Sequence, residues 1–368
     1  MPDTSFVDTN TLSNWLESGR HVTVLDIRPK EQREEWKIPG SIYVDAYKRL
    51  NEGDYSVLDE VAIPEDIPVV AVCAAGRTSQ IAARQLRKKG MEAFSLENGM
   101  KGWSLAWNKS FLDFKYYQII QLRRTGKGCL SYIISSNNNA VIVDASLPVE
   151  VYESALNENN WQLKWVMETH IHADHLSRSK QVADKFKVPL LLPVPNNVQF
   201  DFKKLADNEI INLGNAQIKL IATPGHTVES VCFLINDEVL LSGDTIFTNA
   251  VGRPDLKANE EETKKRAELL YDSLQKILQL NEEIIVLPAH TGSPINFDGK
   301  PLKATLSEIK KTVPVLQLNK EAFVKNILVK LPPPPSNYLA IVEKNLSGDI
   351  SDVNPIELEA GANRCAVS

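Results

Sequence analysis

The chain has 368 residues, enough for two to three domains of about 100–200 residues each. Its content of 43% hydrophobic and 24% charged residues is that of an ordinary globular protein, which excludes the disordered, fibrous and disulfide-scaffold classes. The net charge of −6, from 41 basic and 47 acidic residues, indicates no nucleic-acid partner.

The cysteines and the apolar runs indicate a compartment. The four cysteines lie far apart and form no CxxC pair, so free thiols in a reducing cytoplasm fit better than disulfides. They are Cys73, Cys129, Cys232 and Cys365. The first residues show neither a signal peptide nor a transit peptide, and apolar runs such as residues 68–75 are too short to span a bilayer. We therefore expect a cytoplasmic protein with no membrane partner.

The first 108 residues predict a small α/β domain. Residues 22–27 and 69–73 are short apolar runs of the kind that is buried on both faces of a parallel sheet. The apolar stripe of residues 79–89 predicts a helix that Gly90 ends, and residues 91–96 predict a third strand. Strands that alternate with helices define this domain as residues 1–108.

A segment with aromatic residues, 109–115, is expected to link this domain to a second one at residues 116–368. The second domain is expected to be a layered α/β domain with a long helix over residues 259–280. Its strand candidates are residues 116–122, 130–135, 140–144, 165–167, 218–222, 231–235, 239–242 and 284–288. In the tail, the four prolines at 332–335 predict a polyproline II segment, which we interpret as a stiff surface crossover rather than a partner-docking motif.

Three of the six histidines of the chain fall in one heptapeptide, Thr169-His-Ile-His-Ala-Asp-His175, directly after a strand candidate. Imidazoles and a carboxylate in one loop favour a borderline transition metal, because burying them without one needs several separate hydrogen-bond partners. His226, Asp244 and His290 each follow a later strand candidate. We expect them at strand ends, where α/β enzymes build their sites.

The order of HxHxDH, PGHT, SGD and PAH motifs over residues 115–294 resembles the metallo-β-lactamase superfamily. The resemblance implies an αββα sandwich. It also implies that the seven ligand positions of the two-metal members are all present. These positions are His170, His172, Asp174, His175, His226, Asp244 and His290.

Within that superfamily, residues 168–175, 241–247, 251–255 and 363–365 look like persulfide dioxygenases. In that family one Fe(II) is held by three residues, and the matching positions here are His170, His226 and Asp244. Such a triad of two histidines and one carboxylate leaves open positions for O₂ and substrate. The resemblance then implies that the other four residues, His172, Asp174, His175 and His290, orient ligands and bound water. A site for two zinc ions bridged by Asp244 stays open as the alternative.

Cys73 opens a loop, Cys73-Ala-Ala-Gly-Arg-Thr-Ser79, between a buried strand and a helix. The backbone N–H groups of such a loop favour an anion and lower the pKa of a thiol. Residues 5–108 resemble rhodanese, which implies that Cys73 carries sulfane sulfur and that Arg77 and Thr78 contact substrate. Lys37 stands where rhodaneses usually have a histidine, and Thr78 stands where the loop usually has its late arginine, so the sulfur donor stays open.

Two resemblances to sulfur-handling families imply coupled sulfane-sulfur metabolism. With one Fe(II) per chain, the second domain would use O₂ to oxidise a low-molecular-weight thiol persulfide, such as glutathione persulfide, to sulfite. Cys73 would exchange sulfur with a small thiol, sulfite or thiosulfate. Arg253 is expected either to bind the substrate anion or to form a surface or interdomain ion pair. Cys365 matches a family position near the iron, with an inert tail cysteine as the alternative.

Two other interpretations stay open. One is a two-zinc thioester hydrolase of the glyoxalase II type, with the rhodanese-like domain as a passenger. The other is a sulfur-sensing module without turnover. The flanks of His290 lack the tyrosine of glutathione-using relatives, so another thiol is an alternative substrate carrier. A homo-oligomer also stays open.

Overall fold

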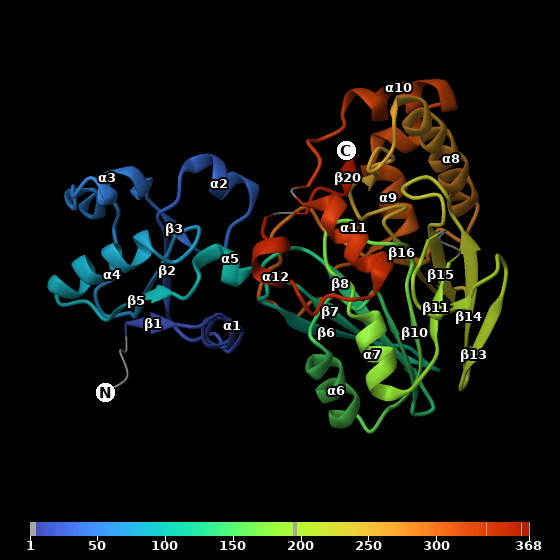
Figure 1. The fold of residues 1–368 in the computed structure, drawn as a ribbon, viewed down its shortest axis with the longest axis horizontal. Helices are drawn as coiled ribbons and strands as arrows, with labels where there is room; N and C mark the ends of the chain where they lie inside the picture. The colour runs from blue at the N-terminus through green and yellow to red at the C-terminus, as the bar shows by residue number, and fades with distance from the viewer. Residues whose placement is uncertain (1–4, 194–196, 336, 362, 368) are drawn as a thin grey trace.

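Two domains lie side by side in the computed structural model, the first on the left of Figure 1 and the second on the right. The structure describes residues 5–193, 197–335, 337–361 and 363–367. Among these residues, no helix combines the length and the apolar character needed to cross a membrane.

The first domain is a five-stranded parallel sheet in the order β1-β5-β4-β2-β3, with helices on both faces. Along β4, Val69 and Ala71 pack into one core cluster and Val70 and Val72 into another, which explains why this strand is apolar without alternation. The strands are β1 (Phe6–Val7), β2 (Thr23–Asp26), β3 (Ile42–Tyr43), β4 (Val69–Val72) and β5 (Ala93–Leu96). The helices are α1 (Thr9–Glu17), α2 (Lys30–Glu35), α3 (Tyr47–Asn51), the 3₁₀ turn η1 (Ser56–Asp59), α4 (Thr78–Lys88) and α5 (Gly99–Trp103).

The expected linker at residues 109–115 is instead mostly a strand. β6 (Asn108–Asp113) pairs antiparallel with β7 (Gln118–Arg123) and belongs to the second domain. Two of its inward positions, Asn108 and Ser110, are polar. The sequence therefore lacks the alternation of apolar and polar residues by which a half-buried strand is predicted. Asn108 accepts a hydrogen bond from Nε of the buried Arg123 at 2.8 Å, which satisfies both groups.

The second domain contains two sheets. The seven-stranded sheet has the order β12-β11-β10-β9-β8-β7-β6, and the six-stranded sheet has the order β13-β14-β15-β16-β18-β19. The first adds β8 (Leu130–Ser136), β9 (Asn139–Val143), β10 (Gln162–Met167), β11 (Leu190–Leu192) and β12 (Lys203–Lys204). The second contains β13 (Ile210–Leu213), β14 (Ala216–Ala222), β15 (Val231–Ile235), β16 (Val239–Gly243), β18 (Ile285–Pro288) and β19 (Ala304–Thr305).

Helices cover the outer face of each sheet, which confirms the expected αββα sandwich. The inner faces meet in a core that joins Tyr132 and Val141 to Phe233 and Leu241. Helices α6 (Val149–Glu158) and α7 (Ser179–Phe186) pack on the seven-stranded sheet. On the six-stranded sheet lie α8 (Glu260–Leu278), which a capping box begins, and then α9 (Leu306–Thr312), η2 (Pro314–Gln317) and α10 (Lys320–Val329).

The tail returns across the second domain instead of leaving it. It forms α11 (Tyr338–Ser347), α12 (Pro355–Leu358) and β20 (Ala366–Val367). β20 pairs antiparallel with β17 (Val251–Gly252), and α12 lies against α5 of the first domain. The prolines before α11 are only partly at the surface, since Pro335 is buried, and the residues after them reach the candidate metal ligands.

Candidate functional site

The candidate metal ligands come from four loops that leave strand ends of the two sheets. The segment from His170 to His175 follows β10, and His226, Asp244 and His290 follow β14, β16 and β18. All seven side chains are at most 2% exposed, so they share one water-poor volume at the edge where the two sheets meet. This confirms that strand ends assemble the cluster.

His170, His226 and Asp244 form a compact group whose ligating atoms lie within 4.8 Å of one another. Oδ2 of Asp244 is 3.7 Å from Nε2 of His170 and 3.4 Å from Nε2 of His226. Two ligands of one ion at bond lengths of about 2.1 Å lie about 3 Å apart, so a small inward shift completes coordination. Burial raises the pKa of Asp244, but the histidines around it lower that pKa below the usual range and keep the carboxylate ionised.

Hydrogen bonds fix the tautomers of both histidines. Nδ1 of His226 lies 2.7 Å from the backbone carbonyl of Arg253, which can only accept, so Nδ1 carries the proton. The hydroxyl of Thr169 donates its one proton to Asp144 at 2.9 Å and therefore accepts from Nδ1 of His170, also at 2.9 Å. Both Nε2 atoms keep a free lone pair directed at Asp244, which is the form that binds a metal.

The remaining candidate ligands divide into two positions. Asp174, His175 and His290 form a second group with Cys129, whose thiol donates to Asp174 at 3.4 Å. His290 lies between two carboxylates, with Nδ1 2.5 Å from Asp244 and Nε2 2.8 Å from Asp174.

His172 belongs to neither group. Its Nε2 lies 3.3 Å from Asp144, and its ring packs 4.2 Å from that of His170.

The donor set fits a metal ion by one physical test. Among the described residues, several buried ligand atoms have no hydrogen-bond partner, and each such atom costs about 1–3 kcal/mol unless a cation accepts its lone pair. These atoms are Nε2 of His170, both ring nitrogens of His172, Nε2 of His175, Nε2 of His290 and Oδ2 of Asp244. Imidazole with carboxylate suits iron and zinc equally well.

The tail supplies three residues of this site, of which Cys365 was expected near the metal and Asn345 and Asn363 were not. Asn345, in α11, donates to the backbone carbonyls of His172 and His175 at 2.8 and 2.9 Å. Asn363 donates to Asp174 at 2.8 Å. Cys365 is 1% exposed, and its sulfur lies within 4.8 Å of ligand atoms of Asp244 and His290. Asn363 and Cys365 sit in a segment with a recognisable motif, but Asn345 has no sequence signal.

Arg253 does not have the substrate-binding role that we considered for it. It is 0% exposed, and all five of its N–H donors are occupied within the chain. Nε and Nη2 bind Asp255, both at 2.7 Å. The other donors bind the carbonyls of Pro332, Pro333 and Arg364. The guanidinium group holds the tail, and it forms an ion pair within the second domain rather than the surface or interdomain pair that was the other expectation.

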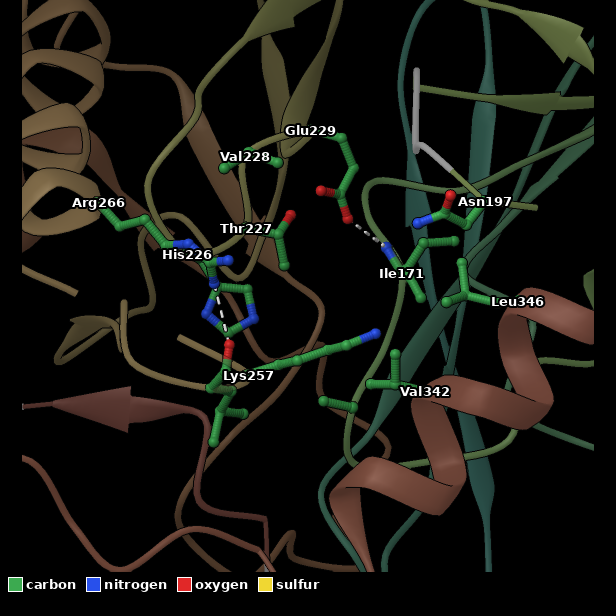
Figure 2. Close-up of a pocket in the computed structure, with 12 residues that line it drawn as sticks. Ile171, Asn197, His226, Thr227, Val228, Glu229, Lys257, Arg266, Val342 and Leu346 are labelled. Carbon is green, nitrogen blue, oxygen red and sulfur yellow. Dashed lines mark hydrogen bonds between the residues drawn. The ribbon is translucent and has the colours of Figure 1, made fainter. Parts of the chain in front are cut away.

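A pocket of about 250 Å³ opens beside His226 (Figure 2). Ile171, Leu256 and Val342 give it an apolar wall, and α11 contributes one side. Lys257 and Arg266 carry positive charge, and Glu229, which accepts from the backbone N–H of Ile171 at 3.3 Å, carries negative charge. The backbone of Lys257 has φ +55°, a conformation that is rare for lysine and is often held at functional sites. Apart from Ile171 and His226, which lie in the histidine motifs, no motif marked the residues of this pocket.

The Cys73 loop lies between β4 and α4, as expected. Cys73 is 2% exposed, and its sulfur lies 3.3 Å from the hydroxyl of Ser79. Among the described residues, the backbone N–H groups of residues 74–77 have no acceptor, so they are free to bind an anion. Of the two expected contact residues, Arg77 is exposed, whereas Thr78 is buried and exchanges hydrogen bonds with Asn51 at 3.3–3.4 Å.

Comparisons with known proteins divide the chain at the same place as the structure. Residues 8–106 match the family described as "Rhodanese-like domain". Residues 124–201 and 202–290 match the family described as "Metallo-beta-lactamase superfamily".

The curated relatives resemble the second domain. A hydroxyacylglutathione hydrolase of Prochlorococcus marinus is 31% identical over 199 residues, which cover 50% of this chain and 75% of that enzyme. An enzyme of the same name from Francisella philomiragia is 30% identical over 169 residues; the match covers 45% of this chain and 64% of that relative, just under two thirds of its length. Among solved structures, ETHE1 from Myxococcus xanthus superposes with a TM-score of 0.54 and 24% identity over 62% of this chain and 97% of its own, which shows a shared fold.

Proposed function

This chain belongs to the metallo-beta-lactamase superfamily and carries a rhodanese-like domain ahead of that fold, and from this premise we propose that it is a persulfide dioxygenase with a sulfurtransferase domain. The reaction converts a thiol persulfide, O₂ and water into the free thiol and sulfite. The substrate is a low-molecular-weight thiol persulfide, for which glutathione persulfide is the first candidate. The four cysteines are free, which agrees with a reducing cytoplasm as the compartment.

The compact grouping of His170, His226 and Asp244 carries the proposal, and Asp244 also belongs to a neighbouring group with His290 and Cys365. His170, His226 and Asp244 would hold one Fe(II), which supplies O₂ activation when bound. His290 supports a single-metal centre through its Nδ1, which is hydrogen-bonded to Asp244 at 2.5 Å and holds that carboxylate in place without a second ion.

The pocket beside His226 supports an anionic thiol as the substrate. Its apolar wall excludes water from the reacting sulfur of the substrate. Lys257 and Arg266 neutralise the carboxylates at the other end of the substrate. Glu229 matches an ammonium group, such as that of a peptide thiol. The side chains of this chain thus bind and orient the substrate beside the triad.

Two observations favour the alternative, a two-zinc thioester hydrolase. The curated relatives are named hydroxyacylglutathione hydrolases, and the structure holds a second ligand group around Asp174, His175 and His290. In that case the two groups, with Asp244 shared between them, would hold the zinc ions, which would supply Lewis-acid activation of the water that hydrolyses the thioester.

Anaerobic purification with metal analysis separates the two functions. We expect one iron per chain, O₂ uptake and sulfite formation with glutathione persulfide. Two zinc ions per chain, no O₂ uptake and hydrolysis of a hydroxyacylglutathione would support the alternative and contradict the dioxygenase.

Paired variants test the division between the domains. His226→Ala should abolish oxidation and lower the metal content while Cys73 still accepts sulfur. Cys73→Ser should abolish sulfur transfer and leave oxidation and metal content unchanged. If either change abolishes both activities in a folded protein, the two sites are not independent.

A further inference from the structure

Strand β6 forms one edge of the seven-stranded sheet, and among the described residues no strand pairs with its outer side (Figure 1). With six residues, it is the longest edge strand in the described part of the chain, where the others have two to four. Free backbone groups at an edge pair readily with another chain, so proteins protect edges with short strands, prolines, bulges or lysines. At the opposite edge, β12 consists of two lysines. β6 contains no proline, and its register with β7 has no bulge.

The hairpin that joins β6 to β7 shows which backbone groups of β6 are free. The N–H of Phe114 donates to the carbonyl of Tyr117 at 2.9 Å. Such bonds recur at every second residue of an antiparallel pair, so Lys109, Phe111 and Asp113 point their N–H and C=O groups away from β7. Among the described residues, these groups have no other backbone partner. They form a row of donors and acceptors that an added strand can satisfy.

The side chains of the same three residues make the strand complementary to itself. Lys109 and Asp113 lie two positions on either side of Phe111, and all three project from the face of the sheet opposite to the buried Ser110 and Leu112. If two copies run antiparallel with Phe111 opposite Phe111, each Lys109 faces the partner's Asp113. This register alone pairs the free backbone groups of all three residues. It also places opposite charges and two aromatic rings across from each other, which stabilises strand pairs.

The surroundings of β6 leave these side chains accessible. Phe111 is 53% exposed, which is unusual for a large apolar side chain unless a partner covers it. Nζ of Lys109 lies 2.7 Å from the carboxylate of Glu158, but both side chains keep exposed surface for a further charge. Helix α1 approaches the chain just before β6, where the hydroxyl of Ser13 lies 3.5 Å from the carbonyl of Trp107. The segment free to pair therefore begins after that contact.

We propose that β6 is the interface of a homodimer, in which two copies of this chain pair antiparallel along residues 109–113 and join their seven-stranded sheets into one continuous sheet. The partner is a second copy because the strand matches itself in backbone hydrogen bonding, charge and apolar contact. The pocket beside His226 shares no residue with β6, so this interface is separate from the substrate pocket. The pairing does not depend on which reaction the metal centre catalyses.

Sedimentation velocity of the full chain over a wide range of concentrations tests the interface. We expect the unmodified chain to approach twice the mass of one copy as the concentration rises. Phe111→Pro removes the central N–H donor of each copy, and the strand tolerates proline there because that N–H does not bond to β7. The variant should raise the dissociation constant of the dimer at least tenfold. A chain that is monomeric at every concentration, or a dimer that folded Phe111→Pro leaves unchanged, overturns the proposal.

Two charge variants test the antiparallel register. Asp113→Lys sets two positive charges against each other at both ends of the interface, and Lys109→Asp sets two negative charges there, so each variant alone should dissociate at least tenfold more readily. An equimolar mixture restores an opposite charge at every pair and should recover a heterodimer. Asp66→Lys, at an exposed loop position of the first domain, is the matched control and should dimerise like the unmodified chain. Variants that are folded by circular dichroism but stay monomeric on mixing contradict the register.

Discussion

Asn363 donates its side-chain amide to Asp174 at 2.8 Å, and 189 residues separate the two in sequence. The bond joins the C-terminal tail to the HxHxDH segment. Asp174 also contacts Cys129, His175 and His290, so Asn363 completes a ring of donors around a buried carboxylate. The tail is thus part of the metal centre in space, although it lies far from the HxHxDH segment in sequence.

Replacing that amide should weaken the site without unfolding the domain. In Asn363→Leu, Asp174 loses one of its donors and no longer orients His290 in the same way. We expect metal content and O₂ uptake to fall about 10- to 100-fold, the range for residues that orient ligands. Asn212→Leu, at an exposed position of β13, is the matched control. Metal content and turnover at the level of the control would show that the bond does not position Asp174.

Lys257 should act on substrate affinity rather than on turnover. Lys257→Gln removes one positive charge from the pocket, and this charge interacts with the substrate equally before and during the reaction. We therefore expect KM for glutathione persulfide to rise about tenfold with kcat nearly unchanged. The exposed Lys265 on α8 offers a control of the same charge, Lys265→Gln. A fall in kcat at constant KM would place Lys257 in the chemistry instead.

The sequence predicted the residues that motifs place at strand ends. His170, His226 and Asp244 converge because each follows the end of a strand, and the packing of the two sheets brings the end of β10 to the ends of β14 and β16. The tail could not be predicted in the same way, because Asn345 and Glu359 act through partners more than 150 residues away. For Arg253, the prediction that its guanidinium group binds a carboxylate was correct, but that carboxylate belongs to Asp255, two residues later in the chain.

β6 shows the same limit at the level of the fold. Its inward side chains include Asn108 and Ser110, so hydrophobic periodicity could not distinguish a strand from a linker. Only the pairing with β7 and the bond from Arg123 to Asn108 make these polar residues suitable for a buried face.

Glu359 should make stability depend on acid pH. Burial raises the pKa of its carboxyl group, but Arg124 and Arg178 lower that pKa below the usual value of 4.5. Because the folded-state pKa is the lower one, ionised Glu359 stabilises the fold above about pH 4.5, and this contribution is lost as pH falls through the folded-state value. Chemical denaturation across this range should show the loss in the unmodified chain.

The variant Glu359→Gln isolates that contribution. It leaves Arg124 buried beside a neutral group, so we expect the free energy of unfolding at pH 7 to fall by about 3 kcal/mol or more. Its stability should then change less with pH below 4.5 than that of the unmodified chain. Glu343→Gln, at an exposed position of α11, should retain the original pH dependence. Parallel pH profiles for Glu359→Gln and the unmodified chain would exclude Glu359 as the source.

Gly252 should be essential for the geometry of His170, His226 and Asp244, because no side chain fits at this position. A Cβ atom at this position would lie 1.9 Å from the carbonyl oxygen of Asp244 and 3.2 Å from Cβ of His226. Gly252→Ala must therefore push the two ligands apart, at a cost of about 1–3 kcal/mol in unfolding free energy and with loss of bound metal. Gly292 is the matched control, since a Cβ there meets no atom within 4 Å, and Gly292→Ala should retain both stability and metal. Thermal denaturation and metal analysis of the two variants check this, and equal metal content in both would show that the triad tolerates the displacement.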